Sequence, residues 1–269
     1  MPSDERRIPG PLPADSITRL RRARRRLLML DYDGTLAPFV KERGEAVPYP
    51  GVRERLSRLV SLARSHVAIV SGRAAASLVP LLGLDSTPEI WGSHGRERRS
   101  PDGRLSLFLP EPEAQCAIGD AHRIAAAAGF LPHLEPKPAG VAVHLRGANE
   151  ETQSRVTRFV EDQWRPIADA NRLDLMEFDG GFELRAPGRT KGSVVQELLD
   201  QCEIGAEDFA AYFGDDQTDE DAFRALGDRG LSILVRDDPR PSLAKCWIRP
   251  PDTLIQMLDI WADADTVKA

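Results

Sequence analysis

The chain has 269 residues, of which 41% are hydrophobic and 29% charged, so it can bury a core and is not largely disordered. Its 36 basic and 42 acidic residues give a net charge of −6, which disfavours a general nucleic-acid-binding protein. No apolar stretch reaches the roughly 20 residues of a membrane helix, and the first residues contain no apolar signal segment. The three scattered cysteines form neither a disulfide framework nor a zinc motif. We therefore expect a cytoplasmic protein with no membrane or nucleic-acid partner, containing one domain with an insert or two modest domains.

The first 26 residues differ in composition from the rest of the chain. Residues up to about Asp15 are rich in proline and charge, and we expect a mobile tail there. The run Arg19–Arg26 predicts a short helix with a solvated basic face. Contact with anionic lipid or RNA is the alternative for this run, although the net charge disfavours it.

Short apolar runs alternate with helical patterns over residues 27–110 and 187–269. The runs Leu27–Leu30 and His66–Ser71 are typical of buried parallel strands, and a helical pattern follows each of them. Ser100–Gly103 has the composition of a hairpin turn. The alternation returns at Phe209–Gly214 and Leu231–Arg236, with helical patterns between. This order predicts an α/β core domain with a parallel sheet and right-handed crossovers.

Residues 111–186 follow a different pattern. Two successive units of helix, strand and strand indicate an inserted α+β domain with a small antiparallel sheet. Asp179–Gly181 is typical of the tight turn in its last hairpin. We therefore expect a core domain of residues 27–110 and 187–269 with an insert between its two halves.

Aspartates gather where two predicted strands end. Asp31 and Asp33 follow the first strand and alternate along it, so both can face one ligand. Asp215, Asp216 and Asp219 follow the late strand. Two carboxylates about 4 Å apart repel by about 4 kcal/mol at an effective dielectric of about 20, so such a cluster needs either a cation or protonation. Hard oxygen ligands suit Mg²⁺. The alternative, that aspartates serve as turn formers or helix caps, stays open for Asp219.

Two further segments could bind an anion. Ser71 and Gly72 stand between a strand and a helix, where a hydroxyl and backbone N–H groups can hold phosphate oxygens. Lys191 opens a helix, a position that the helix dipole makes unfavourable for a cation unless an anion is near. An ordinary surface lysine is the alternative.

These residues resemble the motifs of a known group of proteins. DYDGT, SGR, the helix-opening lysine and GDDxxD, in this order, resemble the four motifs of the haloacid dehalogenase superfamily of phosphotransferases. The insert is similar to that superfamily's large α/β cap. Segments between Leu27 and Phe223, among them LEPKPAGVAVHLR and GGFELRAPGRTKG, resemble the trehalose-6-phosphate phosphatases more closely. The resemblance implies a Rossmann-like core with a cap, and hydrolysis of trehalose 6-phosphate with Mg²⁺.

The resemblance also implies roles for the core residues. Asp31 would be the nucleophile that forms an aspartyl-phosphate, and Asp33 the general acid and base. Ser71 and Lys191 would stabilise the phosphoryl oxygens. The implied metal ligands are the side chain of Asp31, the backbone carbonyl of Asp33 and Asp215, with Asp216 as a direct ligand or a partner of the ligands. Asp219 would orient Lys191.

For the sugar, the resemblance implies Glu135, Lys137 and Glu183 from the cap, with Arg73 and His94 from the core. A surface charge at Glu183, a loop lysine at Lys137 and a turn residue at His94 remain the alternatives.

Other functions are open to the same motifs. Related phosphatases act on sucrose-phosphate, glucosylglycerol-phosphate or mannosyl-phosphoglycerate by the same chemistry. A sugar-phosphate sensor without turnover is a second possibility, although Asp31, Asp33 and Lys191 are all present. A protein tethered to RNA or membrane through its arginine run is a third. We expect a monomer whose partner is a small-molecule substrate.

Overall fold

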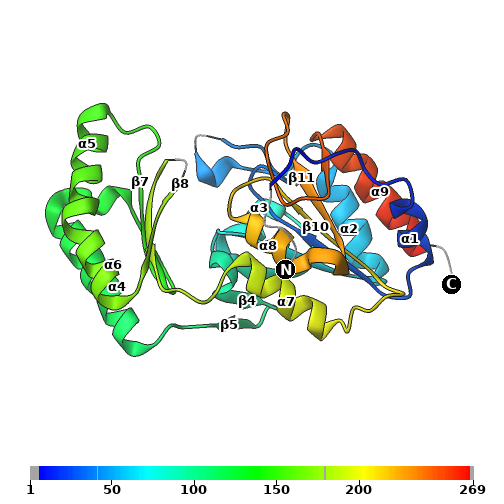
Figure 1. Ribbon diagram of the computed structural model, residues 1–269, viewed down its shortest axis with the longest axis horizontal. Coiled ribbons are helices and arrows are strands. Elements are labelled where there is room, and N and C mark those ends of the chain that lie inside the picture. Colours follow the sequence, from blue (N-terminus) through cyan, green and yellow to red (C-terminus); the bar gives the residue numbers. More distant parts are fainter. Residues whose placement is uncertain (1–5, 41, 179, 267–269) are drawn as a thin grey trace. The chain divides into compact units, whose positions relative to one another are not determined.

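The computed structural model describes residues 6–40, 42–178 and 180–266. The chain divides into two compact units, one of Met1–Ser106 with Thr190–Ala269 and the other of Leu107–Arg189 (Figure 1). Each unit has its own sheet and its own apolar core. The expected insert, residues 111–186, lies within the second unit.

The first unit is built on an eight-stranded sheet. Its strands are β1 (Arg26–Leu30), β2 (Ser65–Val70), β3 (Glu89–Gly92), β4 (Glu97–Arg99), β5 (Leu105–Leu107), β10 (Phe209–Gly214), β11 (Leu231–Val235) and β12 (Cys246–Ile248). They lie in the order β12-β11-β10-β1-β2-β3-β4-β5, parallel from β12 to β3 and antiparallel between β3 and β4. The predicted turn at Ser100–Gly103 is confirmed, because the Gly103 N–H donates to the Ser100 carbonyl between β4 and β5.

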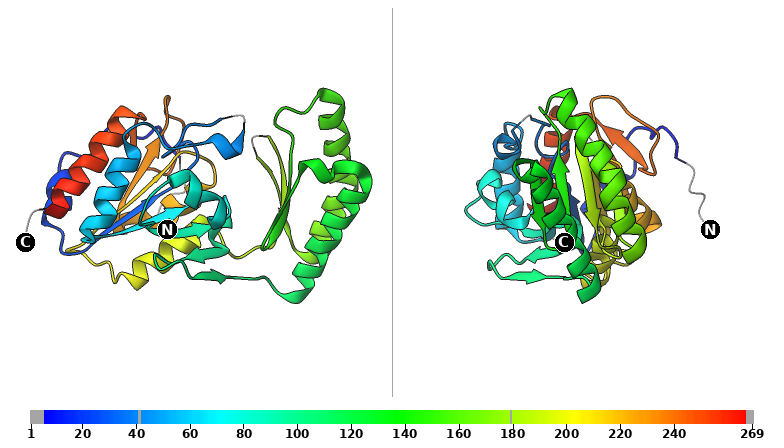
Figure 2. Two further views of the ribbon diagram at one scale, coloured as in Figure 1. Left: turned by 180° about the vertical axis from the view of Figure 1, so that it is seen from behind. Right: turned by 90° about the vertical axis from the view of Figure 1, so that its left-hand side faces the viewer.

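Helices cover both faces of this sheet. They are α1 (Ser16–Arg22), α2 (Val52–Leu62), α3 (Ala75–Leu82), α7 (Lys191–Gln201), α8 (Asp219–Leu226) and α9 (Asp252–Thr266). Helices α2 and α9 pack together on one face with α1 beside α9, whereas α7 and α8 pack together on the other (Figures 1 and 2). Because both faces are covered, the central strands are continuous apolar runs, as β1 shows with all five residues buried.

The register of the central strands brings the predicted aspartates to one edge of the sheet. Leu30, the last residue of β1, aligns with Phe213 of β10 on one side and with Ile69 of β2 on the other. Asp31 and Asp215 therefore leave the carboxyl ends of neighbouring parallel strands, where ligands of such sheets bind.

The N-terminal residues are more ordered than the sequence predicts. Arg7 and Ser242 exchange two backbone hydrogen bonds, and the Trp247 N–H donates to the Gly10 carbonyl beside β12. The expectation of a mobile tail is wrong for residues 7–10, because their backbone groups pair with the edge of the sheet. Residues 1–5 lie outside the described residues.

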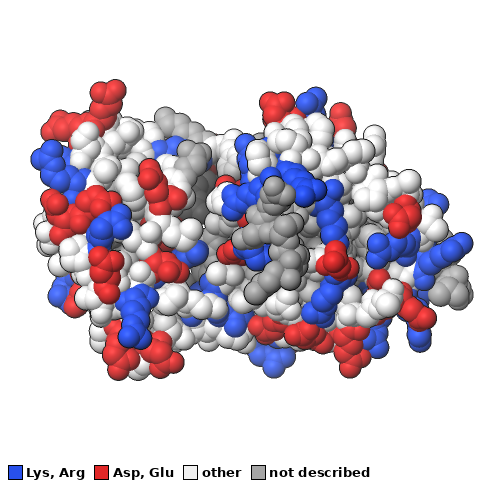
Figure 3. Space-filling view, in the orientation of Figure 1, with Lys and Arg blue, Asp and Glu red and all other residues white. Residues whose placement is uncertain are grey.

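The predicted helix is confirmed only for the first part of the basic run, because α1 ends at Arg22 and Arg26 begins β1. Arg24 pairs with Glu207 at 3.2 Å, and Arg26 lies 3.5 Å from the buried Asp265. On the face in Figure 3, acidic and basic side chains are interspersed over both units. Arg19, Arg21 and Arg22 of α1 are exposed, as expected of a solvated helix face, whereas Arg26 is buried.

The second unit has two layers, a four-stranded sheet and a layer of helices. Its strands are β6 (Leu134–Lys137), β7 (Gly140–His144), β8 (Asp174–Phe178) and β9 (Gly181–Arg185), and its helices are α4 (Pro112–Ala125), α5 (Glu150–Phe159) and α6 (Arg165–Asn171). The strands are antiparallel in the order β6-β7-β9-β8, and the helices lie on one face of the sheet (Figure 1). The buried Trp164 packs among apolar residues of both layers. In the predicted turn between β8 and β9, Gly180 has a φ of 97°, while Asp179 lies outside the described residues.

The predicted fold class, a parallel α/β core with an inserted α+β unit, is confirmed. Within the described part of the chain, no helix combines the length and the apolar character needed to cross a membrane.

The close packing of α7 on α8 gives a testable prediction about stability. A Cβ atom at Gly192 would lie 2.6 Å from the backbone oxygen of Asp221, so Gly192→Ala must push the two helices apart. We expect it to lower the free energy of unfolding by about 1–3 kcal/mol in urea denaturation. The control is Gly119→Ala in α4, where a Cβ atom meets nothing within 4 Å, and which should be neutral or stabilising by up to about 1 kcal/mol. Equal effects of the two substitutions would contradict the packing argument.

Candidate active site

A buried lysine joins two aspartates at the carboxyl edge of the first sheet. Asp31 follows β1, and its backbone N–H donates to the Phe213 carbonyl at 2.9 Å. Lys191, the first residue of α7, places its Nζ 2.7 Å from Asp31 Oδ1 and 2.8 Å from Asp219 Oδ1. All three side chains are at most 5% exposed. Lys191 is therefore not an ordinary surface lysine but the partner of two buried anions.

Asp219 is fixed by more partners than any other carboxylate of the cluster. Its Oδ2 accepts the backbone N–H groups of Asp215 and Asp216 at 3.1 and 3.0 Å. Its Oδ1 accepts from the Tyr212 hydroxyl at 2.7 Å as well as from Lys191. The alternative of Asp219 as a turn-forming residue is thus correct in part, since it ties the turn after β10, but it also holds Lys191.

Asp215 completes an acidic cluster. Oxygen atoms of Asp31, Asp215 and Asp219 all lie within 4.8 Å of one another. Gly34 makes room for this approach, because it has a φ of 79° and a Cβ atom there would lie 2.3 Å from Asp215 Oδ2. Asp216, in contrast, is exposed, and it is Asp219 that joins the other two carboxylates.

The electrostatics of the cluster favour a bound cation. Burial raises the pKa of Asp31 to about 7, although Lys191 opposes this shift. Burial, followed by repulsion from Asp31, raises the pKa of Asp215 well above its ordinary range. Burial would lower the pKa of Lys191, but the charges of Asp219 and Asp31 outweigh it and raise the pKa. With all three carboxylates ionised, the cluster would carry more negative charge than the single ammonium group balances, so it takes up protons or a cation.

The residues present fit a divalent metal ion. Asp215 Oδ1 is buried and has no hydrogen-bond partner among the residues that the structure describes, so a polar atom is left for a ligand. Carboxylate oxygens are the ligands that hard divalent cations take. The cluster thus offers both the donor atoms and the charge for such an ion.

Asp33 stands beside this cluster in a different environment. The Arg73 guanidinium donates from Nε to Asp33 Oδ2 and from Nη2 to Asp33 Oδ1, each at 2.6 Å. The same guanidinium lies over the Tyr32 ring at 5.6 Å. Such a paired contact fixes the carboxylate in one orientation. Arg73, predicted as a substrate residue, is in this structure a partner of Asp33.

Ser71 and His94 belong to one pair of adjoining loops. Ser71 follows β2, its Oγ accepts the Arg73 backbone N–H at 3.2 Å, and its carbonyl accepts the His94 N–H at 3.0 Å. A Cβ atom at Gly72 would lie 2.7 Å from the His94 ring, so glycine lets the imidazole pack on this loop. His94 has a φ of 54°, a conformation that is uncommon outside glycine.

Glu97 holds these loops together, and the sequence analysis did not identify it. Its carboxylate accepts the Ala75 backbone N–H at 2.7 Å and the Ser93 hydroxyl at 2.8 Å. It is buried within β4. No periodic pattern or spacing in the sequence distinguishes such a residue from a surface glutamate.

In the second unit, the predicted sugar-binding residues share one face of the sheet. Glu135 aligns with Ala142 of β7, which aligns in turn with Glu183 of β9. Lys137 Nζ lies 2.6 Å from Glu183 Oε2. His144, which the sequence analysis did not single out, lies 2.6 Å from Glu135. The structure therefore places Glu135, Lys137 and Glu183 on one sheet face of this unit, and each of them is ion-paired with a residue of a strand.

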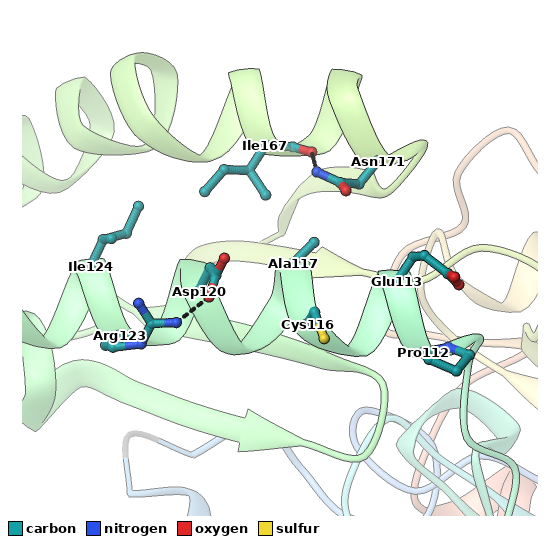
Figure 4. A pocket seen from close by; sticks show the side chains of 9 residues that line it. All are labelled: Pro112, Glu113, Cys116, Ala117, Asp120, Arg123, Ile124, Ile167 and Asn171. Atoms are coloured by element: carbon teal, nitrogen blue, oxygen red, sulfur yellow. Dashed lines mark hydrogen bonds and ion pairs between the residues drawn. The ribbon is translucent and has the colours of Figure 1, made fainter.

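A hollow elsewhere in the second unit contains none of these residues. It is about 630 Å³ in volume and lies between α4 and α6 (Figure 4). Its polar groups include the ion pair of Arg123 with Asp120, and Ile124 and Ile167 supply apolar surface. Phosphate chemistry is better supported at the acidic cluster, where buried carboxylates meet a lysine.

The parallel α/β sheet carries Asp31, Lys191, Asp215 and Asp219 at its carboxyl edge, and the chain also contains an inserted α+β unit. Its fold matches that of BT1666 of Bacteroides thetaiotaomicron, a phosphatase of the haloalkanoate (HAD) enzyme superfamily, with a TM-score of 0.58 at 16% identity, covering 94% and 98% of the two chains. The family model described as Trehalose-phosphatase matches residues 29–246. The chain belongs to this family. The family implies a divalent metal, and the buried aspartates provide a site that fits one.

Individual relatives agree with this membership. The chain is 34% identical over 227 residues to a bifunctional trehalose-6-phosphate synthase/phosphatase of Thermoproteus tenax, covering 83% of this chain and 30% of that one. It is 34% identical over 222 residues to a trehalose-phosphate phosphatase of Mycobacterium marinum, covering 78% of this chain and 53% of that one. The chain thus spans about half the length of these relatives or less. The fold matches the C-terminal domain of C. albicans trehalose-6-phosphate phosphatase with a TM-score of 0.78 at 20% identity, covering 97% and 99% of the two chains.

The crowding of carboxylates predicts that Asp215→Asn stabilises the metal-free protein. Because the folded state binds the Asp215 proton more tightly than the unfolded state, the free energy of unfolding falls as pH rises from the ordinary pKa of the carboxyl through its raised pKa. The amide removes this loss, so at neutral pH and with EDTA we expect Tm to rise by about 2–4 °C, the shift that about 1 kcal/mol produces in a chain of this size.

Added divalent metal should stabilise the wild type and not the Asp215→Asn variant. Asp228→Asn, which changes an exposed carboxylate, is the control and should behave as the wild type. A lower Tm for Asp215→Asn without metal would contradict the view that this charge is uncompensated.

Proposed function

We propose that this protein hydrolyses trehalose 6-phosphate to trehalose and phosphate, the last step of trehalose biosynthesis. The observation that carries the proposal is the buried contact of Asp31 with Lys191 beside Asp215, in a chain of the trehalose-phosphatase family. The substrate is a small molecule. We propose that the protein acts in the cytoplasm as a monomer, without nucleic acid or membrane as a partner.

Asp31 is the nucleophile of the proposed reaction. One of its oxygens attacks the phosphorus, and the bond from phosphorus to the sugar oxygen breaks, which leaves an aspartyl-phosphate and free trehalose. Asp33 donates the proton that the departing sugar oxygen needs. It then takes a proton from a water molecule that attacks the aspartyl-phosphate and releases phosphate. The paired contact with Arg73 keeps the Asp33 carboxyl group in one place during both steps.

Lys191 and Ser71 stabilise the charge on the transferring group. The Lys191 ammonium lies 2.7 Å from Asp31, so it is placed beside the phosphoryl oxygens when Asp31 attacks. Asp219 holds Lys191 there, and its remaining hydrogen-bonding capacity is taken by Tyr212 and backbone N–H groups. The Ser71 hydroxyl supplies a further donor at the neighbouring strand end.

Mg²⁺ is the proposed metal. The side chains of Asp31 and Asp215 and the backbone carbonyl of Asp33 would hold it, with Asp216 as a ligand or a partner of the ligands. When bound, the ion supplies positive charge toward the phosphoryl oxygens. Its charge would also compensate the burial and carboxylate repulsion that raise the pKa of Asp31 and of Asp215.

Residues 111–186, within the second unit, are the proposed cap domain, and residues 27–110 and 187–269 are the proposed core domain. Glu135, Lys137 and Glu183 share one sheet face and would bind the hydroxyl groups of the disaccharide. Arg73 and His94 are the proposed substrate contacts from the core. In the case of Arg73 this role comes in addition to its contact with Asp33.

Phosphate release tests the proposed reaction. The wild type should hydrolyse trehalose 6-phosphate with Mg²⁺ and not with EDTA, and should act more slowly on sucrose-phosphate, glucosylglycerol-phosphate and mannosyl-phosphoglycerate. Asp31→Asn should lower turnover by about 10³-fold or more, because the amide cannot attack phosphorus. Asp200→Asn, at an exposed carboxylate, is the control and should keep full activity. A folded Asp31→Asn variant with wild-type turnover would refute the nucleophile.

Glu183→Ala tests sugar recognition. We expect kcat/KM for trehalose 6-phosphate to fall by about 10- to 100-fold, the value of one or two charge-assisted hydrogen bonds, while hydrolysis of p-nitrophenyl phosphate changes little. Glu177→Ala, on the neighbouring β8 and exposed, is the matched control. Equal losses on both substrates would remove Glu183 from the sugar site.

A further inference from the structure

Two arginines outside the family motifs contact the backbone of Asp215. Arg236 follows β11, and its Nη1 donates to the Asp215 carbonyl at 3.3 Å. Arg240 donates to the same carbonyl from Nη2, also at 3.3 Å. Both arginines lie in the loop between β11 and β12. The Asp215 carbonyl therefore has two cationic donors outside the acidic cluster.

The N–H of Asp215 is held from the opposite direction. It donates to Asp219 Oδ2 at 3.1 Å, inside the cluster. With its N–H and its carbonyl both fixed, the backbone of Asp215 has little freedom to turn. The side chain is thereby kept beside Asp31, with one of its oxygens within 4.8 Å of an Asp31 oxygen. Oδ2 lies against Gly34, and Oδ1 is buried without a hydrogen-bond partner among the described residues.

Arg240 is itself anchored by a buried acid. Its Nη1 pairs with Glu220, the second residue of α8, whose side chain is 2% exposed. The other oxygen of Glu220 accepts the Leu243 backbone N–H at 2.8 Å. The loop after β11 is thus tied to the start of α8. It is also tied on its other side to the N-terminal residues, through the backbone pair of Arg7 and Ser242.

We propose that Arg236 and Arg240 are positioning residues that hold Asp215 in the orientation that binds the metal ion, a role that rests on the proposed function. Partners that orient metal ligands commonly contribute 10- to 100-fold to metal affinity. Neither arginine touches the reacting atoms, so their effect is on the affinity for the metal and on activity only through it.

The positive charge of the arginines lowers the affinity of the site for a metal ion, whereas their proposed positioning role raises it. Arg236 Nη1 lies 4.0 Å from Asp215 Oδ2, so as a bare charge it repels a metal ion at this site. Removal of a cation that acted through charge alone would strengthen metal binding. Removal of a cation that holds the carbonyl weakens it. The sign of the change therefore separates the two effects.

The experiment is an isothermal calorimetric titration of the metal-free, full-length protein with MgCl₂ alone. Arg236→Gln should bind Mg²⁺ about tenfold more weakly than the wild type. The double variant Arg240→Gln with Glu220→Gln removes the second donor at constant net charge and should show a loss of similar size. Arg229→Gln is the matched control, because the side chains of Arg229 and Arg236 are both 40% exposed. Arg229 pairs with Asp200 and with the Gln196 amide, and not with Asp215. It should bind as the wild type does.

Unchanged or tighter Mg²⁺ binding by Arg236→Gln would overturn the proposal, and so would an equal loss in Arg229→Gln. Saturating Mg²⁺ should restore kcat in the Arg236 variant, since only metal affinity is lowered. A kcat that stays low at saturation would contradict a role through the metal. Failure of the wild type to hydrolyse trehalose 6-phosphate would refute the proposed function instead, because the Mg²⁺ titration contains no substrate.

Discussion

A buried ammonium group between two carboxylates is the interaction on which the site depends. Ions taken from water into a protein interior cost several kcal/mol each unless hydrogen bonds compensate them. Lys191 has this compensation from Asp31 and Asp219, and Asp219 has it from Tyr212 and from backbone N–H groups. The contact joins the end of β1, the start of α7 and the start of α8, which are far apart in the sequence. The geometry of Asp31, the proposed nucleophile, is therefore a consequence of how the first unit folds.

The same contact leaves a charge imbalance that gives the site its chemistry. Asp215 is brought beside Asp31 because β1 and β10 are adjacent parallel strands, and Gly34 leaves room for it. No basic side chain within the described residues is hydrogen-bonded to its Oδ1. A buried, unbalanced carboxylate is costly to the folded protein without metal, and it becomes favourable when a divalent ion binds. The stability of the metal-free protein and the proposed metal binding thus make opposite demands on Asp215, and the proposed role of the arginines in the loop after β11 is to hold it in the metal-binding orientation.

The fold and the central residues could be predicted from the sequence because their signals are local. Apolar runs such as Leu27–Leu30 mark buried strands, and aspartates directly after them must lie at the ligand-binding edge. Contacts made by single side chains across the fold leave no such signal. The pairing of Arg73 with Asp33, the anchoring by Glu97 and the contacts of Arg236 with Asp215 depend on packing between distant segments. Glu135, Lys137 and Glu183 were named from the family resemblance and not from a local pattern, and their role in sugar binding is a proposal.

The measurement that tests the central claim most directly is a crystal structure of the protein soaked in Mn²⁺, with the metal located by its anomalous scattering. Mn²⁺ takes oxygen ligands as Mg²⁺ does and can be identified without assumption about its position. The account predicts one strong peak within coordination distance of carboxylate oxygens of both Asp31 and Asp215, with Lys191 still bound to Asp219. A peak elsewhere, or none at these two aspartates under conditions in which the enzyme turns over, would contradict it.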